Sequence, residues 1–178
     1  PNAVLLISSS GPRTDYESFM ELAAKMSSIG LQFSIHETTD EKRNLLMPFK
    51  DKLTLAEIAL KGEEFFKRTG RKAFFNYCVH DANNTPEDIT RLRSLFNPEM
   101  WNATISVICE RDETLKAAHE RQEELTDAFM EKLEEAGFNC RRFNPAGQSD
   151  IAGGCGMLWE TQKWVKDNPD RARPSVRF

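Results

Sequence analysis

Three neighbouring segments decide the fold: Ala73-Phe-Phe-Asn-Tyr-Cys-Val79, Thr85-Pro-Glu-Asp88 and Ala103-Thr-Ile-Ser-Val-Ile-Cys109. The first and third are short and mostly apolar, as buried strands are. Between them, Thr85 can cap a helix that begins with Pro86, and acidic side chains follow near the positive end of the helix dipole. A strand, a helix and a second strand of this kind predict a parallel pair joined by a helical crossover.

The same alternation continues in both directions along the chain. We expect further buried strands at Ala3–Ile7, Leu31–Ile35 and Phe138–Phe143. Helical patterns lie between and after the strands, and capping residues mark several of their ends. They are a helix that starts in a capping box of Thr14 with Glu17 and stops at Gly30, a short helix at Asp40–Met47, a helix that starts at Thr54 with Glu57 and ends at Gly70, a long helix at Glu113–Ala136, and a final helix at Met157–Lys166.

These five strands predict an α/β fold with a parallel sheet. Periodicity alone does not separate an open doubly wound sheet from most of a barrel. In both architectures, ligands gather at the carboxyl ends of the strands. The polar residues that directly follow each strand are therefore the candidates for a binding site.

Composition limits the class of protein. The chain has 178 residues, enough for one domain with a core, and its 39% hydrophobic and 29% charged residues are ordinary for a globular protein. No apolar run has the length of a membrane span and no secretory signal is visible, so we expect no membrane association. The net charge of −4 argues against a domain whose whole surface binds nucleic acid, but it permits a local basic patch.

The four cysteines are Cys78, Cys109, Cys140 and Cys155, and none has C-x-x-C spacing. A zinc knuckle or a thioredoxin-type pair is therefore not indicated, and we expect no metal ligand in this chain. The first three lie in or at the ends of strands, where we expect buried thiols. Without a disulfide pattern, a reducing cytoplasm is the expected location.

The fourth cysteine lies in Asp150-Ile-Ala-Gly-Gly-Cys-Gly-Met-Leu158, with glycine on both sides. Glycine permits backbone conformations that other residues avoid and lets another molecule approach closely. A cysteine in a core would be surrounded by bulky apolar residues instead. The pattern indicates a presented thiol at Cys155, or a tight turn that happens to contain a cysteine.

Two strand ends carry further candidates. Ser8-Ser-Ser-Gly11 supplies hydroxyl groups and backbone N–H groups that can bind carboxylates or phosphates, or it is a polar turn. In Ser34-Ile35-His36, an extended backbone would place Ser34 and His36 on the same side, with a histidine that exchanges protons near neutral pH or only caps the strand. His80 and Asp81 can be acid–base residues or loop residues. No dinucleotide fingerprint, P-loop or zinc-protease motif is present.

In their order along the chain, three segments resemble the RlmN/Cfr family of radical S-adenosylmethionine (SAM) RNA methylases. Ser8-Ser-Ser-Gly11 is similar to a Ser-Thr-Ser-Gly segment of that family. Phe33-Ser-Ile-His36, continued through Asp40-Glu41, Arg43 and Leu46-Met-Pro48, is similar to its Ser-Leu-His, Asn-Asp-Glu, Arg and Leu-Met-Pro run. Asp150-Ile151 to Leu158 is similar to Asp-Ile-Asp-Ala-Ala-Cys-Gly-Gln-Leu. The resemblance is to the carboxyl-terminal part of the catalytic domain and extends to about Leu158.

The resemblance implies a partial (β/α) TIM-type barrel of the radical SAM class. Residues 1–166 would be its carboxyl-terminal portion, followed by an irregular basic tail at 167–178. Ser8, Ser34, Ile35 and His36 would contact SAM. Cys155 would accept a methyl group from SAM, and the methyl carbon would then be added to an adenine of ribosomal or transfer RNA, which makes RNA the expected partner.

The resemblance also implies a 4Fe-4S cluster and a reductant such as flavodoxin. The family's C-x-x-x-C-x-x-C motif is absent from this sequence, so we expect the cluster ligands outside this chain and no activity from the chain alone. The family's Asn-Pro-Phe segment is replaced by Cys109-Glu-Arg-Asp112. Two alternatives therefore stay open: a radical SAM enzyme with a non-RNA substrate, and a non-catalytic partial barrel that acts as a binding module, in which a partner covers the strand edges.

The carboxyl-terminal quarter has a basic bias that is consistent with RNA contact, or with a solvated helix face and tail. Its members are Arg141, Arg142, Lys163, Lys166, Arg171, Arg173 and Arg177.

Overall fold

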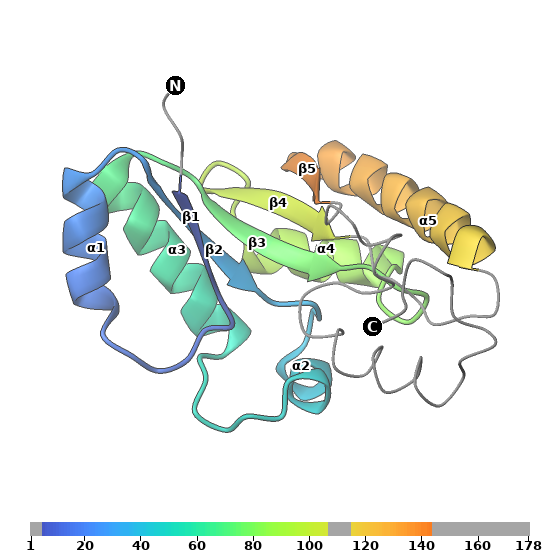
Figure 1. Ribbon diagram of the computed structural model, residues 1–178, viewed down its shortest axis with the longest axis horizontal. Helices are drawn as coiled ribbons and strands as arrows, with labels where there is room; N and C mark the ends of the chain where they lie inside the picture. The colour runs from blue at the N-terminus through green and yellow to red at the C-terminus, as the bar shows by residue number, and fades with distance from the viewer. Residues whose placement is uncertain (1–4, 107–114, 144–178) are drawn as a thin grey trace, which may run out of the picture.

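The computed structural model describes residues 5–106 and 115–143, with side chains at 5–106 and 122–143 (Figure 1). Strands and helices alternate along the chain, as the sequence predicts. The elements are β1 (Leu5–Ser9), α1 (Tyr16–Lys25), β2 (Ile29–Ser34), α2 (Asp40–Leu46), α3 (Leu55–Thr69), β3 (Ala73–Cys78), α4 (Pro86–Leu95), β4 (Trp101–Ser106), α5 (Leu115–Glu135) and β5 (Asn139–Phe143).

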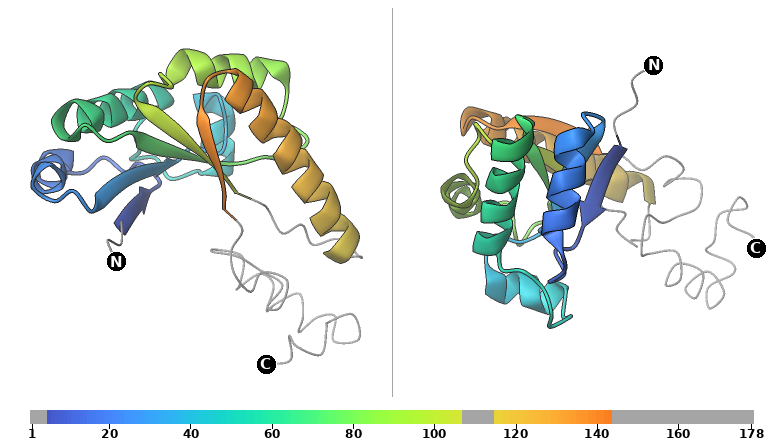
Figure 2. Two further views of the ribbon diagram at one scale, coloured as in Figure 1. Left: turned by 90° about the horizontal axis from the view of Figure 1, so that it is seen from above. Right: turned by 90° about the vertical axis from the view of Figure 1, so that its left-hand side faces the viewer.

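The strands form one parallel sheet in the order β1-β2-β3-β4-β5. A doubly wound sheet reverses its strand order at a switch point and carries helices on both faces. This sheet has no reversal, and α1, α3, α4 and α5 lie along the same face (Figure 2). The order and the one-sided cover are those of a partial (β/α) barrel, which confirms the fold class expected from the resemblance.

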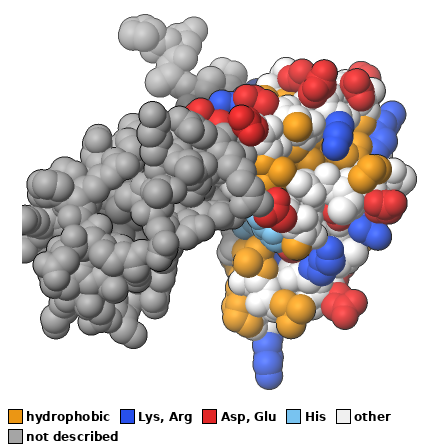
Figure 3. Space-filling view, turned by 90° about the vertical axis from the view of Figure 1, so that its right-hand side faces the viewer, with side chains coloured by type: hydrophobic (Ala, Val, Ile, Leu, Met, Phe, Trp, Pro, Cys, Tyr) orange, Lys and Arg blue, Asp and Glu red, His pale blue; other side chains and the backbone are white. Residues whose placement is uncertain are grey.

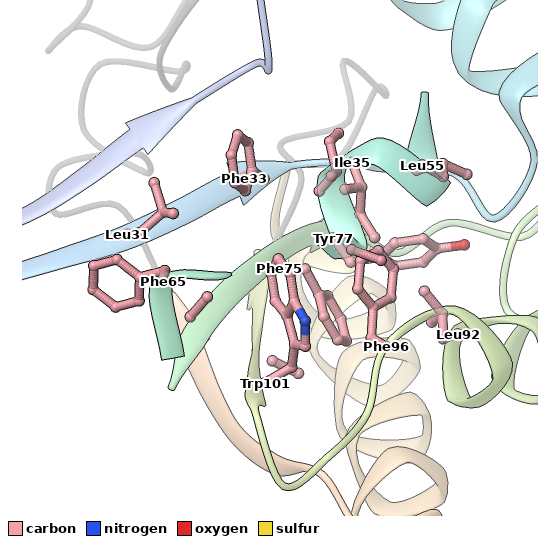
Figure 4. Packing of buried hydrophobic residues seen from close by; sticks show 14 of the residues in the cluster. Leu31, Phe33, Ile35, Leu55, Phe65, Phe75, Tyr77, Leu92, Phe96 and Trp101 are labelled. Carbon is pink, nitrogen blue, oxygen red and sulfur yellow. The ribbon is translucent and has the colours of Figure 1, made fainter. Parts of the chain in front are cut away.

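The hydrophobic core lies between that face and the helices. Leu31, Phe33 and Ile35 point into it from β2 and its end, while Phe75 and Tyr77 come from β3 (Figure 4). Burial alternates strictly along β3, because successive side chains of a strand point to opposite faces. The core is therefore one layer between sheet and helices, and it leaves the other face of the sheet to polar residues.

Local sequence signals set most helix ends. Thr54 with Glu57 and Thr85 with Asp88 both form capping boxes, and Gly70 ends α3 at φ +69°, in the left-handed region that glycine tolerates. The prediction for α1 is wrong at both ends. Asp15 caps α1, because its carboxylate accepts from the N–H groups of Glu17 and Ser18, and α1 ends at Lys25, so that Gly30 lies inside β2.

The expected buried strand at Ala3–Ile7 is observed as β1 (Leu5–Ser9), but it is largely exposed. Leu5 and Ile7 are 61% and 38% exposed although they point to the helix-covered side of the sheet. The reason is position: β1 is an edge strand, and no helix described here covers its outer side. Leu22 and Met26 of α1 are exposed as well.

Several predictions fall outside the described residues. They are the end of the strand at Ala103–Cys109, the start of the helix at Glu113, the final helix at Met157–Lys166, the tail at 167–178 and the loop that contains Cys155. The boundary between a barrel portion at 1–166 and a tail therefore stays a prediction. Among the helices that the structure describes, none is long and apolar enough to span a membrane.

Gly62 gives α3 its close approach to the sheet. A Cβ at this position would overlap the indole ring of Trp101, which is fully buried in β4. Glycine in a helix interior costs about 1 kcal/mol relative to alanine, so its presence here reflects packing and not helix propensity.

We expect Gly62→Ala to lower the free energy of unfolding by about 2 kcal/mol, because the added methyl group overpacks the contact with Trp101. Urea unfolding followed by circular dichroism measures the change. Leu60→Ala, on the exposed side of the same helix, is the control and should change stability by less than about 0.5 kcal/mol. Equal stability of Gly62→Ala and the unmodified protein would contradict the packing shown here.

Candidate functional site

The face of the sheet that no described helix covers is lined mainly by polar side chains, and we call it the polar face. Its members alternate with the core residues along each strand and pair with one another in the parallel register. They are Leu6, Ser8, Gly30, Gln32, Ser34, Phe74, Asn76, Cys78, Asn102, Thr104, Ser106, Asn139, Arg141 and Phe143.

One row of contacts crosses this face from β1 to β5. The Gln32 amide Nε2 donates to Ser8 Oγ at 3.0 Å. Arg141 donates from Nη2 to Gln32 Oε1 at 3.1 Å and from Nε to Thr104 Oγ1 at 2.8 Å. Its guanidinium carbon lies 4.4 Å from the centre of the Phe74 ring. Five strands therefore contribute to one connected group, and it fixes the position of a positive charge over the middle of the sheet.

Nearer the carboxyl ends of the strands lies a second polar group. Ser106 Oγ donates to Asn76 Oδ1 at 2.8 Å, and the backbone N–H of Cys78 donates to His36 Nδ1 at 3.1 Å. The Cys78 side chain shares this face with Ser106. Burial raises the pKa of the Cys78 thiol to about 11, so this cysteine is a neutral polar group at physiological pH.

His36 does not continue the extended strand, contrary to the prediction that it lies on the same side as Ser34. Its φ is +59°, a conformation that non-glycine residues rarely adopt. Asn83 stabilises it, because Nδ2 of Asn83 donates to the carbonyl oxygens of both His36 and Cys78 at 3.0 Å. The turn at His36 is what brings its Nδ1 to the N–H of Cys78.

The His36 ring is neutral above about pH 4. Burial, together with the charge of Arg43, lowers its pKa from 6.5 to about 4. Since Nδ1 accepts a hydrogen bond, the ring proton resides on Nε2, which can act only as a donor. His36 is therefore suited to bind an acceptor on a ligand, and it is not suited to proton transfer near neutral pH.

Glu37 and His80 form a pair at the same end of the sheet. Oε1 of Glu37 lies 3.4 Å from Nε2 of His80, and the backbone N–H of His80 donates to Asn83 Oδ1 at 2.7 Å. The Glu37 side chain is only 8% exposed, and its Oε2 has no hydrogen-bond partner among the described residues. In Figure 3, seen from the side where β2, β3 and β4 end, histidine surface lies beside acidic surface. His80 therefore lies in a loop, and its contacts with Glu37 and Asn83 join it to the polar groups at the carboxyl ends of the strands.

Arg43, one of the residues that carry the motif resemblance, is fully buried below the loop that follows β1. Its Nη1 donates to the Leu53 carbonyl and its Nη2 to the Ser10 carbonyl, both at 2.7 Å. Burial lowers its pKa, with the charge of Asp40 opposing that effect. Arg43 acts as a structural clamp that holds the Ser8-to-Gly11 loop against the segment before α3.

The structure brings some of the predicted site residues together and separates others. Ser8 and Ser34 lie on the polar face, and His36 lies at its carboxyl end. The Ile35 side chain is fully buried among core residues, and its backbone N–H donates to the Asn76 carbonyl oxygen at 3.0 Å, so a contact of Ile35 with SAM would have to use its carbonyl oxygen. Cys155 lies outside the described residues. Among the expected buried thiols, Cys78 and Cys140 are only partly buried.

Sequence reasoning missed Gln32 and Asn83 and did not separate Arg141 from Arg142. Arg142 lies on the other side of β5, where it pairs with Asp127 and lies 3.8 Å from Glu123. Successive side chains of a strand point to opposite faces, so Arg141 shares a face with Asn139 and Arg142 lies on the other. This alternation could have separated the two arginines from the sequence alone. A glutamine inside the apolar run of β2 was the corresponding signal for Gln32.

Metal ligands do not gather in the described part of the chain. No group of three or more His, Cys, Asp or Glu side chains there could hold a metal ion. Cys78 and Cys140 lie on opposite faces of the sheet, and burial raises the pKa of the Cys140 thiol to about 12. These residues do not fit an iron–sulfur cluster, which requires several thiolates in one place.

The pKa of His36 generates a prediction about stability. The unfolded chain binds a proton at this ring more readily than the folded chain, so stability should fall as the pH falls from 6.5 to about 4. The loss approaches roughly 3 kcal/mol, and it should be absent from His36→Gln. Urea unfolding at several pH values measures it, and an NMR titration of the ring gives the pKa directly. A ring that titrates near pH 6.5 in the folded protein would contradict the burial.

No family model matches the sequence. A protein of Clostridium botulinum (strain Alaska E43 / Type E3) named probable dual-specificity RNA methyltransferase RlmN is 31% identical over 140 residues, which are 78% of this chain and 39% of that protein. A protein of Nitrosopumilus maritimus named ribosomal RNA large subunit methyltransferase N is 28% identical over 139 residues, 78% of this chain and 38% of that protein.

In structure, the chain resembles a radical SAM methyltransferase from Sphaerobacter thermophilus, with a TM-score of 0.63 and 18% identity over 83% of this chain and 42% of that one. At this identity the likeness concerns the fold. The chain spans about 39% of the length of the C. botulinum relative. With the motifs, the sequence similarity and the fold in agreement, the chain is RlmN-like and resembles the carboxyl-terminal part of the catalytic domain of radical SAM RNA methyltransferases.

Proposed function

We propose that this chain forms part of an enzyme that methylates an adenine of ribosomal or transfer RNA through a methylated Cys155. The observation that carries the proposal is the similarity to proteins named RlmN over 78% of the chain. The polar face supports it, because a barrel of this kind binds its ligands at the carboxyl ends of its strands. SAM would supply the methyl group.

SAM fits the residues that are present. It is a charged nucleoside with ribose hydroxyl, amino and carboxylate groups, and the polar face offers hydroxyl groups of Ser8 and Ser34 with the amide of Gln32. His36 Nε2 adds a donor at the strand ends. These residues would bind and orient SAM, while the buried side chain of Ile35 supports the site from the core.

The first chemical step on this chain would be the methylation of Cys155. The deprotonated thiol attacks the methyl carbon of SAM, a carbon–sulfur bond forms to Cys155, and the bond to the sulfonium breaks with release of S-adenosylhomocysteine. The glycines on both sides of Cys155 suit a sulfur that must meet SAM and then a nucleobase. A reducing cytoplasm would keep this thiol free, and we include that location in the proposal.

A 4Fe-4S cluster does not fit the described residues, and the sequence contains no C-x-x-x-C-x-x-C motif. We propose that its ligands lie outside this chain, together with the contact site of a reductant such as flavodoxin. Residues 5–106 and 115–143 would therefore supply no ligand for the steps of the reaction that depend on the cluster. The chain alone would be inactive, and further strands would have to complete the barrel.

The edge of the sheet indicates where those strands would bind. β1 has a neighbour only on the β2 side, and Leu5 and Ile7 are exposed next to it. Unpaired edge strands with apolar side chains promote association. We propose that further parallel strands with their helices cover this edge, whether they belong to the same polypeptide or to a partner.

A non-RNA substrate is the second candidate. The observation that favours it is the net charge of −4, which is opposite to the charge expected for extensive contact with phosphates. A salt-dependent affinity for ribosomal RNA would exclude it, and methylation that proceeds without RNA would support it. A binding module without catalysis would show neither SAM binding nor methyl transfer.

Reconstitution with iron and sulfide tests the position of the cluster. After anaerobic reconstitution, we expect the 178-residue chain to carry no iron–sulfur cluster, because its four cysteines do not have the C-x-x-x-C-x-x-C spacing. The structure describes two of them, Cys78 and Cys140; burial keeps their thiols protonated, and the two lie on opposite faces of the sheet. Iron and sulfide analysis with absorption spectroscopy measures this. A stoichiometric cluster would show that the chain supplies ligands.

Replacement of Cys155 tests the proposed function. In the complete enzyme, Cys155→Ala should abolish methylation of RNA while SAM still binds, because the acceptor thiol is lost and the polar face is intact. Mass spectrometry should locate a methyl group on the Cys155 peptide of the unmodified enzyme after incubation with SAM. Cys140→Ala, with its thiol on the core side of β5, is the matched control and should retain activity. Unchanged methylation by Cys155→Ala would remove this residue from the reaction.

A further inference from the structure

Arg141 and Arg142 differ in whether a described carboxylate lies next to the guanidinium. Arg142, on the opposite face of β5, pairs with the carboxylate of Asp127 and lies near that of Glu123. Arg141 forms no ion pair with a described residue, and its described partners are a hydroxyl, an amide oxygen and an aromatic ring. Its charge on the polar face is therefore held in place, and no carboxylate among the described side chains neutralises it.

The contacts of Arg141 also leave part of its guanidinium available. A guanidinium has five N–H groups in a planar arrangement. Nε uses its single N–H for Thr104 and Nη2 uses one for Gln32, so three N–H groups, two of them on Nη1, form no hydrogen bond with the described residues. Such a planar edge matches the two oxygens of a carboxylate or phosphate.

The surroundings hold this group rigid before a ligand binds. The side chain extends from β5 across β4 to Phe74 of β3 and Gln32 of β2, and Gln32 continues to Ser8 of β1. A side chain whose rotamer is already fixed loses less entropy when it binds a ligand. Ser8, a predicted SAM contact, is thus connected to Arg141 through a single residue.

We infer that Arg141 binds the carboxylate of the methionyl group of SAM. The inference rests on the proposed function, since it requires that SAM occupies the polar face. A carboxylate of SAM is favoured over an RNA phosphate because Gln32, which accepts from Arg141, also donates to Ser8, so the guanidinium belongs to the same group of contacts as a residue expected to bind SAM. The role of Gln32 and Thr104 is then to position the guanidinium.

Calorimetric titration of the complete enzyme with SAM and with decarboxylated SAM tests this inference. The unmodified enzyme should bind decarboxylated SAM about tenfold more weakly than SAM, or worse, because the charge-assisted hydrogen bonds are lost. Arg141→Gln should weaken SAM binding by a similar factor and should leave the affinity for decarboxylated SAM unchanged. Arg141→Lys, which keeps the charge but not the planar edge, should lie between the two.

Arg142→Gln is the matched control, since it removes an arginine from the same strand on the opposite face, and it should bind SAM normally. Circular dichroism of each variant monitors folding. If Arg141→Gln unfolds, Arg141→Lys decides the point, because it should still weaken the binding of SAM and leave the affinity for decarboxylated SAM unchanged.

Three outcomes would overturn the inference. Equal affinity of the unmodified enzyme for SAM and decarboxylated SAM would show that no group binds the carboxylate. Equal losses for both ligands in Arg141→Gln would assign a structural role to Arg141, and weaker RNA binding with normal SAM binding would assign it to an RNA phosphate. An enzyme that binds SAM in none of its forms would instead refute the proposed function itself.

Discussion

The aromatic packing around Phe75 is the interaction on which the rest of the structure depends. The Phe75 ring contacts Phe96 at the end of α4, Trp101 of β4 and Phe138 before β5, with ring centres 5.1, 6.5 and 5.3 Å away. Such pairs contribute beyond the apolar area that they bury. Because the cluster joins the strands and helices on one side only, it determines which face of the sheet is covered and which is left for polar residues. Gly62 extends this packing to α3, since only a residue without a side chain fits against Trp101.

The polar face follows from that asymmetry. Apolar side chains on the helix-covered face form the hydrophobic core. The residues that alternate with them along each strand can therefore carry hydroxyl, amide and guanidinium groups without reducing the apolar area buried in that core. Burying polar groups is costly unless they form hydrogen bonds, and the hydrogen bonds from Ser8 to Arg141 meet this requirement on β1, β2, β4 and β5, while β3 contributes the Phe74 ring beneath the guanidinium. At the carboxyl ends, Asn83 stabilises the turn at His36 in the same way. The site is therefore formed by the sheet as a whole and not by one loop.

Features that depend on neighbouring residues were predictable from the sequence. The capping boxes at Thr54 and Thr85 and the glycine end of α3 involve contacts within a few residues, and they are observed as expected. The cap of α1 was not predictable, because Thr14 and Asp15 are both good capping residues and only the backbone decides between them. The exposure of β1, the left-handed turn at His36 and the contact between Gln32 and Arg141, which are 109 residues apart, depend on the assembled sheet. The resemblance predicts Ser8 and Ser34 as SAM contacts, but it contains no information on which groups connect them.

The hydrogen bonds of Arg43 limit how the neighbouring loops can move. Its guanidinium holds the Ser10 carbonyl and the Leu53 carbonyl at the same time, and it is fully buried. If either loop moved alone, a buried charge would lose an acceptor, which is an unfavourable state. The loop after β1, the short helix α2 that contains Arg43 and the start of α3 must therefore move as one rigid body. Any closure of this rim over a ligand would be a hinge motion of the whole unit, and not the independent ordering of a flexible serine loop.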